Sequence, residues 1–162
     1  MTFHEQDFDR QWQALAEPSS PAEPLRWEWE NGRAECSLEN VESLACSLQE
    51  LKVYSDSLAG ADAAQLQSRG QQLAQRLRYL TEPLQVLETD AETPAVQMRS
   101  LPPQREGKTS LYYELELRPG AICLQRYCKR PGQPRRSVGA NLTKEVLLRL
   151  MRDVQSATEN PA

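Results

Sequence analysis

Residues 110–129 read SLYYELELRPGAICLQRYCK and decide the fold, because they alternate more regularly than any other stretch. Every second residue from 111 to 117 is apolar or aromatic, which is typical of a strand buried on one face. Pro119 and Gly120 occupy the central positions of a predicted type II turn. Ile122 and Leu124 continue the buried face on the return strand, so the stretch predicts an antiparallel hairpin.

A helix is predicted after this hairpin, over residues 143–154 (TKEVLLRLMRDV). Thr143 is a suitable N-cap and Glu145 lies in the first turn, where the helix dipole favours an acid. One wide apolar face is formed by Val146, Leu147, Leu150, Met151 and Val154. We therefore expect this helix to pack on the sheet, with a short strand at 136–140 before it and a polar, disordered tail from Gln155.

The region 38–80 has apolar residues at alternating spacings of three and four, which favour two helices. Those of the first helix (38–58) are Val41, Leu44, Leu48, Leu51 and Leu58, and those of the second are Leu66, Leu73, Leu77 and Leu80. Ala59–Asp62 separates them and Pro83 follows the second. The pattern predicts an antiparallel helical hairpin, in which Gly70 allows a close approach.

Further strands are predicted at 25–30, 84–89 and 95–100, and residues 101–108 have no periodicity and are expected to form a mobile loop. Asn31-Gly32 predicts a two-residue hairpin turn, the alternative being a turn from an edge strand into the next helix. The fold class is α+β: an N-terminal helical hairpin, an antiparallel sheet of about four or five strands, and a C-terminal helix on the sheet. We expect a flexible segment 1–24 with a Pro/Ser linker at 17–24, one domain over 25–157, and a disordered tail over 158–162.

The charge is unevenly distributed along the 162 residues, whose formal net charge is −4. Residues 1–95 hold 17 acidic and 7 basic side chains, whereas residues 96–162 hold 6 acidic and 12 basic ones. Such halves often contact each other or separate partners. The first residues resemble no secretory signal and no apolar run is long enough to span a membrane, so we expect a cytoplasmic protein with reduced cysteines.

Catalytic motifs are hard to place in this chain, whose only histidine is His4. Triads of the Ser-His-Asp or Cys-His kind need a positioned imidazole. Cys36, Cys46, Cys123 and Cys128 do not have the spacing of a zinc ribbon, and a metal site would need the fold to gather all four. Glu114 and Glu116 are expected on an exposed strand face. The sequence therefore predicts no enzyme, no metal and no cofactor.

Two segments are candidate binding sites. Phe8, Trp12 and Leu15 form one stripe of a short helix, which either docks in a partner's groove or packs on its own domain. The second candidate is the basic segment 126–136, in which Arg126, Tyr127, Lys129, Arg130, Arg135 and Arg136 are the proposed contacts. These cations either hold phosphates while tyrosines stack on bases, or form a solvated turn paired with the acidic half.

The function that these features favour is a non-enzymatic protein-interaction module. Its partner is expected to be an unidentified protein or a second copy of the chain, and we expect no membrane contact. The alternative is a protein that binds single-stranded nucleic acid through the basic 126–136 hairpin.

Overall fold

The computed structural model describes residues 3–20 and 23–159. Within these ranges the helices are α1 (Phe3–Leu15), α2 (Ala63–Arg76) and α3 (Lys144–Glu159), with short 3-10 turns η1 (Asp56–Leu58) and η2 (Leu77–Tyr79). The strands are β1 (Leu25–Trp29), β2 (Gly32–Glu39), β3 (Ala45–Ser55), β4 (Leu84–Asp90), β5 (Ala95–Ser100), β6 (Gln104–Glu106), β7 (Thr109–Arg118), β8 (Ala121–Lys129), β9 (Arg136–Val138) and β10 (Ala140–Thr143). The predicted linker and tail are described only in part, since residues 21–22 and 160–162 lie outside these ranges.

All the strands join one antiparallel sheet with the order β1-β2-β3-β8-β7-β5-β4. The remaining strands β6, β9 and β10 pair with β7, β8 and β3, respectively. The predicted α+β class and C-terminal helix are confirmed, but the sheet has ten strands in place of the expected four or five. The additional strands include β3 in the region expected to be helical and β6 in the expected loop, and the strand expected at 136–140 is divided into β9 and β10.

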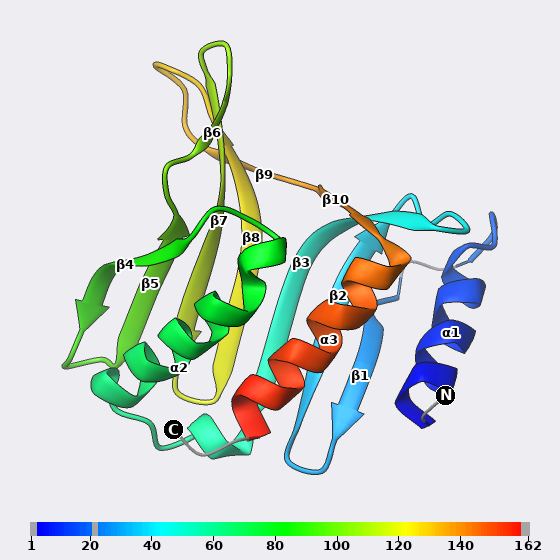
Figure 1. Ribbon diagram of the computed structural model, residues 1–162, viewed down its shortest axis with the longest axis horizontal. Helices are drawn as coiled ribbons and strands as arrows, with labels where there is room; N and C mark the ends of the chain where they lie inside the picture. Colours follow the sequence, from blue (N-terminus) through cyan, green and yellow to red (C-terminus); the bar gives the residue numbers. More distant parts are fainter. Residues whose placement is uncertain (1–2, 21–22, 160–162) are drawn as a thin grey trace.

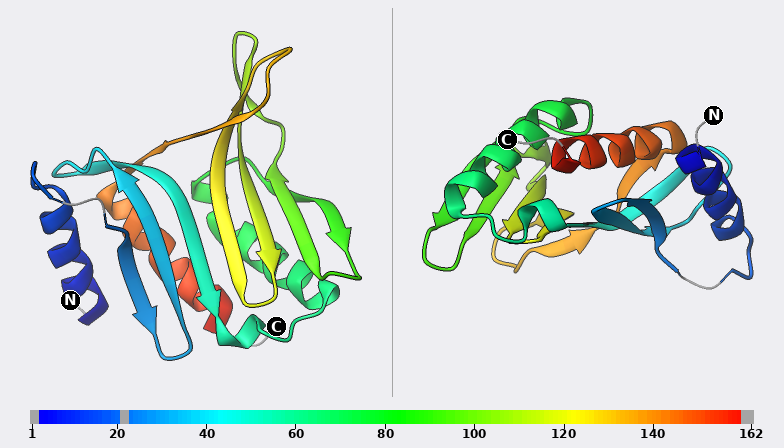
Figure 2. Two further views of the ribbon diagram at one scale, coloured as in Figure 1. Left: turned by 180° about the vertical axis from the view of Figure 1, so that it is seen from behind. Right: turned by 90° about the horizontal axis from the view of Figure 1, so that it is seen from below.

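Helices α2 and α3 lie along one face of the sheet, α1 lies beside the outer strand β1, and the other face is bare (Figures 1 and 2). Contacts of α2 are with β4, β5 and β7, whereas α3 packs on β2, β3 and β10 and also touches α2. Leucines from both helices and from β3, β7 and β8 form the centre of the core and are almost completely buried. The sheet therefore has one apolar face toward the helices and one polar face toward solvent.

Helix α3 confirms the helix predicted over 143–154. The Val146 backbone N–H donates to Thr143 Oγ1 at 3.1 Å, so Thr143 is the N-cap as expected. The disordered tail predicted from Gln155 is wrong, because the helix continues to Glu159. Ala157 and Thr158 are buried, and the Thr158 hydroxyl donates to the Val154 carbonyl, so this last turn belongs to the core.

The helix predicted over 38–58 is wrong: this region contains the end of β2, a turn, and the whole of β3. The physical reason is an irregularity in the β2–β3 pairing. Ser37 pairs with Glu50, but Leu38 pairs with Leu48, so that Gln49 is an extra residue. Such a bulge shifts the alternation by one position. Leu48 and Leu51 therefore both face the core although they are three residues apart, which imitates helical spacing.

The second predicted helix is confirmed as α2. The predicted helical hairpin is wrong, because the first helix, expected over 38–58, is absent. Asp62 is its N-cap: the Asp62 side chain accepts from the Gln65 N–H, and the Gln65 side chain accepts from the Asp62 N–H. Gly70 permits a close approach, but to the sheet and not to a second helix. A Cβ added at Gly70 would lie 2.6 Å from Met98 Sδ of β5.

Both predicted hairpins are present. Arg118 pairs with Ala121 across the β7–β8 turn, where Gly120 has a φ of +79° as a type II turn requires. The β1–β2 hairpin is shifted by one residue, because Gly32 is paired with Trp29 and the loop is Glu30-Asn31. A side chain at Gly32 would clash with the Trp29 ring. The loop expected over 101–108 contains strand β6, which pairs with β7.

Candidate interaction arm

A four-stranded extension projects from the sheet beyond the helices, at the top of Figure 1. It consists of residues 104–111 and 126–138, which comprise β6, the start of β7, the end of β8, and β9. We call it the arm. It contains seven basic side chains and one acidic side chain, a net charge of +6 in a chain of net charge −4. The rest of the protein therefore carries −10, and the charge is separated in space as well as in sequence.

Strand β6 adds cations to the arm that the basic segment 126–136 does not contain. In the register of the arm, Arg105 pairs with Ser110, which in turn pairs with Lys129. The β6–β7 turn, which carries Lys108, therefore lies at the same end as the β8–β9 turn, which carries Arg130 (Figure 2). Sequence reasoning missed Arg105 and Lys108, because nothing in residues 101–108 indicates a strand.

A buried carboxylate, Glu114 of β7, fixes the base of the arm. The side chain is only 7% exposed and pairs with Arg135 from the loop before β9 and with Arg99 of β5, the latter at 3.2 Å. The amide of Gln97 also donates to Glu114 Oε1 at 2.6 Å. Burial alone would raise the pKa of Glu114, but the hydrogen bonds from Arg135 and Gln97 hold it below its usual value. The expectation that Glu114 is solvated is therefore wrong.

Two tyrosines next to Glu114 have arginines on their ring faces. The Arg99 guanidinium lies 4.4 Å from the centroid of the Tyr112 ring, and that of Arg135 lies 4.0 Å from the Tyr127 ring. Tyr112 is buried, and its ring is also in contact with that of Tyr127, at 6.0 Å between centroids. These rings are therefore packed into the base of the arm and do not offer free faces.

Two further predicted contacts are also engaged within the protein. Arg126 points to the helix side of the sheet, where it lies over the Tyr113 ring and donates to Gln104 Oε1 at 2.9 Å. The Lys129 ammonium donates to the carbonyls of Arg130 and Gln133 and so closes the β8–β9 turn. Arg126 and Arg135 thus lie on opposite faces, and the segment does not present its six predicted residues together.

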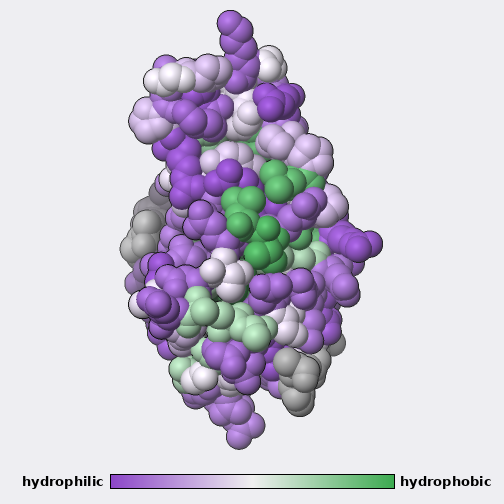
Figure 3. All heavy atoms as spheres, turned by 90° about the vertical axis from the view of Figure 1, so that its left-hand side faces the viewer, coloured by the Kyte–Doolittle hydropathy of each residue, from purple (hydrophilic) through white to green (hydrophobic). Residues whose placement is uncertain are grey.

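Four cations of the arm are exposed with neither an ion pair nor a side-chain hydrogen bond to a described residue: Arg105, Lys108, Arg130 and Arg136. We call them the arm-tip cations. The end of the arm is accordingly hydrophilic in the space-filling view, at the top of Figure 3. The candidate site thus consists of the arm-tip cations at the end of the arm, while Glu114 holds the other end of the arm against the sheet.

The other predicted site, the stripe Phe8, Trp12 and Leu15, lies on α1 beside β1. Phe8 and Trp12 are 0% and 2% exposed, and Leu15 is partly buried. Phe8 meets the Trp27 ring edge-on, and the Trp12 indole N–H donates to the Glu42 carbonyl at 2.9 Å. Docking of this stripe in a partner would require α1 to leave the sheet, at a cost of about 2–3 kcal/mol for each large apolar side chain exposed.

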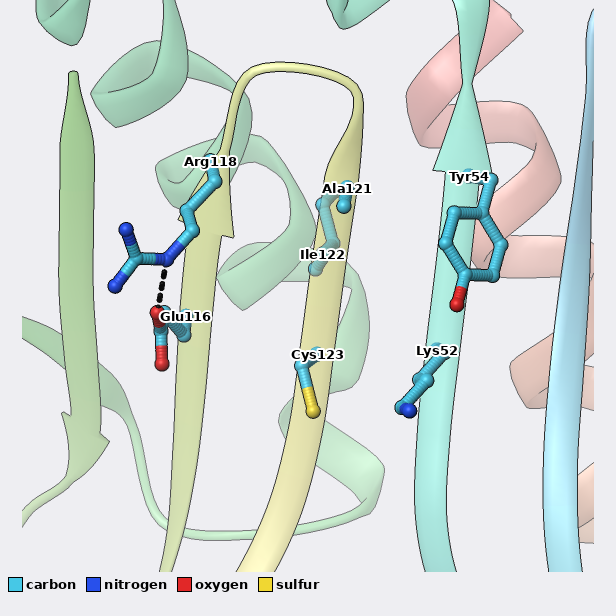
Figure 4. A pocket seen from close by; sticks show the side chains of 7 residues that line it. All are labelled: Lys52, Tyr54, Glu116, Arg118, Ala121, Ile122 and Cys123. Carbon is cyan, nitrogen blue, oxygen red and sulfur yellow. Dashed lines mark hydrogen bonds and ion pairs between the residues drawn. The ribbon is translucent and has the colours of Figure 1, made fainter. Parts of the chain in front are cut away.

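One cavity of the structure is lined by side chains of types that also serve in catalysis. A shallow cavity of about 200 Å³ on the bare face contains Lys52 and Tyr54 of β3 and Cys123 of β8 (Figure 4). Burial, followed by the charge of Glu50, raises the pKa of Cys123 to about 11, so the thiol is protonated near neutral pH. Arg118 is paired with Glu116, and Lys52 with Glu50 at 3.3 Å. Both cations that line this cavity are therefore neutralised by neighbouring glutamates.

His4 contributes to the packing of α1. Its Nε2 lies 2.7 Å from the Glu28 carbonyl oxygen and its ring stacks on Trp27. In the described ranges there is no cluster of three or more potential metal ligands. No described helix is long and apolar enough to cross a membrane. Comparisons of the chain with protein families, with curated proteins and with solved structures found no match.

Proposed function

We propose that this protein is a non-enzymatic interaction module that binds an acidic surface of a partner protein through the arm. The observation that carries the proposal is the separation of charge, with +6 on the arm and −10 on the remainder. A basic projection on an acidic body attracts an acidic partner and orients it, since the body repels the same partner.

The construction of the arm supports a binding role. The buried carboxylate of Glu114 holds the base of the arm in position, so the backbone at the base is ordered before a partner binds. Four unpaired cations at the tip also require no internal ion pair to be broken. A partner therefore gains charge pairs at low cost.

Single-stranded nucleic acid is the second candidate, favoured by the five arginines among the seven cations of the arm. It ranks below an acidic protein because single-strand binding without sequence preference relies on aromatic faces that stack on bases. Here the faces of Tyr112 and Tyr127 are in contact with Arg99 and Arg135. The arm thus offers phosphate contacts but no stacking surface.

Fluorescence anisotropy with two labelled probes tests the class of partner: a poly-L-glutamate peptide and a single-stranded oligodeoxythymidine of equal charge. We expect the peptide to bind at low salt at least as tightly as the oligonucleotide. Tighter binding of the oligonucleotide, with a log–log salt slope of about −3 for four phosphate contacts, would favour the second candidate. Failure of both probes to bind at low salt would contradict both functions.

A further inference from the structure

The two outer strands of the sheet, β1 and β4, differ in how their edges are covered. At β1 the Gln11 side chain of α1 accepts from the Arg26 N–H and donates to the Arg26 carbonyl, both at 2.7 Å. His4 reaches the Glu28 carbonyl two residues further on. Helix α1 therefore occupies backbone groups to which another strand would bind, and the β1 edge is closed.

The β4 edge lacks such a cover in the described part of the chain. Strand β4 pairs with β5 on one side only, so alternate backbone N–H and C=O groups point away from the sheet. Leu87 lies at a bulge, between the Val86–Met98 and Glu88–Gln97 pairs, and is 41% exposed. A bulge and charged side chains such as Glu88 and Asp90 are features that limit unselective strand addition at an exposed edge. The residue at this bulge is nevertheless an exposed leucine, which can contact an apolar side chain of an added strand.

Two hollows flank this edge, one on each face of the sheet. On the helix side a groove of about 290 Å³ lies between α2 and the start of β4. Ala74, Pro83 and Leu84 form its apolar part, and Gln71, Gln75 and Arg78 form its polar part. On the bare side a hollow of about 280 Å³ is lined by Glu88 and Asp90 of β4 and by residues of β5 and β7. Figure 3 looks onto the side of the molecule on which β4 lies, at the left of Figure 1, and shows a small apolar patch within a hydrophilic surface.

The hollow on the bare side is acidic. Four carboxylates and two guanidinium groups line it. Hydrogen bonds from the Thr93 hydroxyl and from backbone N–H groups lower the pKa of Asp90, which keeps it charged at neutral pH. Glu88 has no ion pair with a described residue. Negative charge thus remains at the outer rim of the β4 edge.

We propose that the β4 edge is a second binding site, which accepts an extended segment of a partner protein as an added strand. Successive side chains of a strand point to opposite faces. One set of the added side chains enters the groove at Ala74 and Leu84 and is apolar. The other set faces Glu88 and Asp90 and is basic, so the recognised segment alternates apolar residues with Lys or Arg. This site does not include the arm-tip cations, although Glu114 and Arg135 at the base of the arm also line its hollow.

A second copy of the chain is a poorer occupant of the edge. The side chains of its own β4 that would face the acidic hollow are Gln85, Glu88 and Asp90, as the pairing with β5 shows. None of them is basic, so self-pairing would add negative charge to a hollow that already has it. The charge of the rim thus selects a basic segment.

Selection from a phage-displayed library of random peptides of about ten residues, a full strand length, tests the proposal on the complete chain. We expect the selected peptides to alternate apolar and basic residues, and to protect the amides of residues 84–90 from hydrogen exchange. Leu87→Lys should lower the affinity for a selected peptide by about tenfold or more. Glu88→Lys should lower the affinity for basic peptides and raise the affinity for peptides in which Glu replaces Lys.

Both side chains are exposed, so these variants should fold, and their circular dichroism melts provide the check. The double arm variant Arg130→Glu, Arg136→Glu should bind the selected peptide as the natural protein does, which separates this site from the arm. Absence of selected peptides, or equal binding by Leu87→Lys and the natural protein, would overturn the proposal. So would light scattering that shows a dimer which Leu87→Lys converts to a monomer.

Discussion

Glu114 is the residue on which the position of the arm depends most. It is one of the few buried charged side chains among the described residues, and it contacts residues from β5 and from the loop before β9. A buried charge of this kind is tolerated only because its partners compensate for the loss of water. The carboxylate therefore links the base of the arm to the middle of the sheet.

Replacement of Glu114 by Gln should lower the free energy of unfolding by about 1–3 kcal/mol, because Arg99 and Arg135 lose the charge that compensates them. Urea denaturation measures the change. The matched control is Glu116→Gln on the same strand, whose side chain is 44% exposed and pairs only with Arg118 among the described residues. The control should change stability by less than about 0.5 kcal/mol; equal losses would contradict the role of Glu114.

The contribution of Glu114 to the free energy of unfolding should depend on pH. The folded pKa of Glu114 lies below its unfolded value, so the stabilisation is complete above the ordinary value of 4.5 and is lost as pH falls through the folded pKa. The natural protein should therefore lose stability below pH 4.5 more steeply than Glu114→Gln does. Denaturation curves at a series of acidic pH values measure this, and parallel losses in both proteins would show that other groups are responsible.

Cys123 should react slowly although it is the most exposed of the four thiols. A rise of its pKa from 9.0 to about 11 lowers the thiolate fraction near neutral pH by about a hundredfold. Labelling with a thiol-specific chromogenic reagent should be slow in the folded protein and complete for all four cysteines after denaturation. Glu50→Gln should accelerate the reaction of Cys123, because the Glu50 charge contributes to the rise. Rapid labelling of the folded protein would contradict this assignment.

At the scale of elements, helix α1 acts as the cover of a sheet edge. Its Gln11 amide replaces the hydrogen bonds that another strand would make to Arg26, while Phe8 and Trp12 fill the core behind β1. The helix is thus held by both apolar and polar contacts. This explains why the stripe that resembles a docking motif is buried.

Gln11→Ala should therefore destabilise the protein by about 1–3 kcal/mol and accelerate hydrogen exchange of the Arg26 amide, since two edge groups lose their partner. Gln13→Ala is the control, because Gln13 lies on the exposed face of the same helix. Its effect should be below about 0.5 kcal/mol. If the Arg26 amide exchanges at the same rate in both variants, α1 does not close this edge.

The elements also show what the sequence could predict. The hairpin over 110–129, helix α2 and helix α3 follow from strict local periodicity and from turn or cap residues such as Gly120, Asp62 and Thr143. Strand β3 could not be predicted in this way, because the bulge at Gln49 changes the spacing of its apolar residues. The short strand β6 has no local signal at all and forms only because β7 offers a partner.

The candidate site was predictable only in part for the same reason. Arg130 and Arg136 are visible as a basic segment, but Arg105 and Lys108 join them through strand pairing that the sequence does not encode locally. The burial of Glu114 depends on Arg135, which is 21 residues distant. Long-range contacts of this kind determine which cations are free and which are structural.

At the scale of the whole molecule, the described ranges form an acidic body with a basic arm at one end and an open sheet edge along one side (Figure 1). The two sites face different directions and carry opposite charge. We infer a protein that contacts two partners of different chemistry, an acidic surface at the arm and a basic extended segment at β4.

The most direct test of the central claim is the binding of labelled poly-L-glutamate to two double variants with the same change in charge. Arg130→Glu with Arg136→Glu alters the arm tip, whereas Arg76→Glu with Arg78→Glu alters exposed residues of the body. At low salt the arm variant should bind about tenfold more weakly than the natural protein, and the body variant within about threefold, because close charges dominate. Equal weakening by the two variants would show that net charge, and not the arm, controls binding.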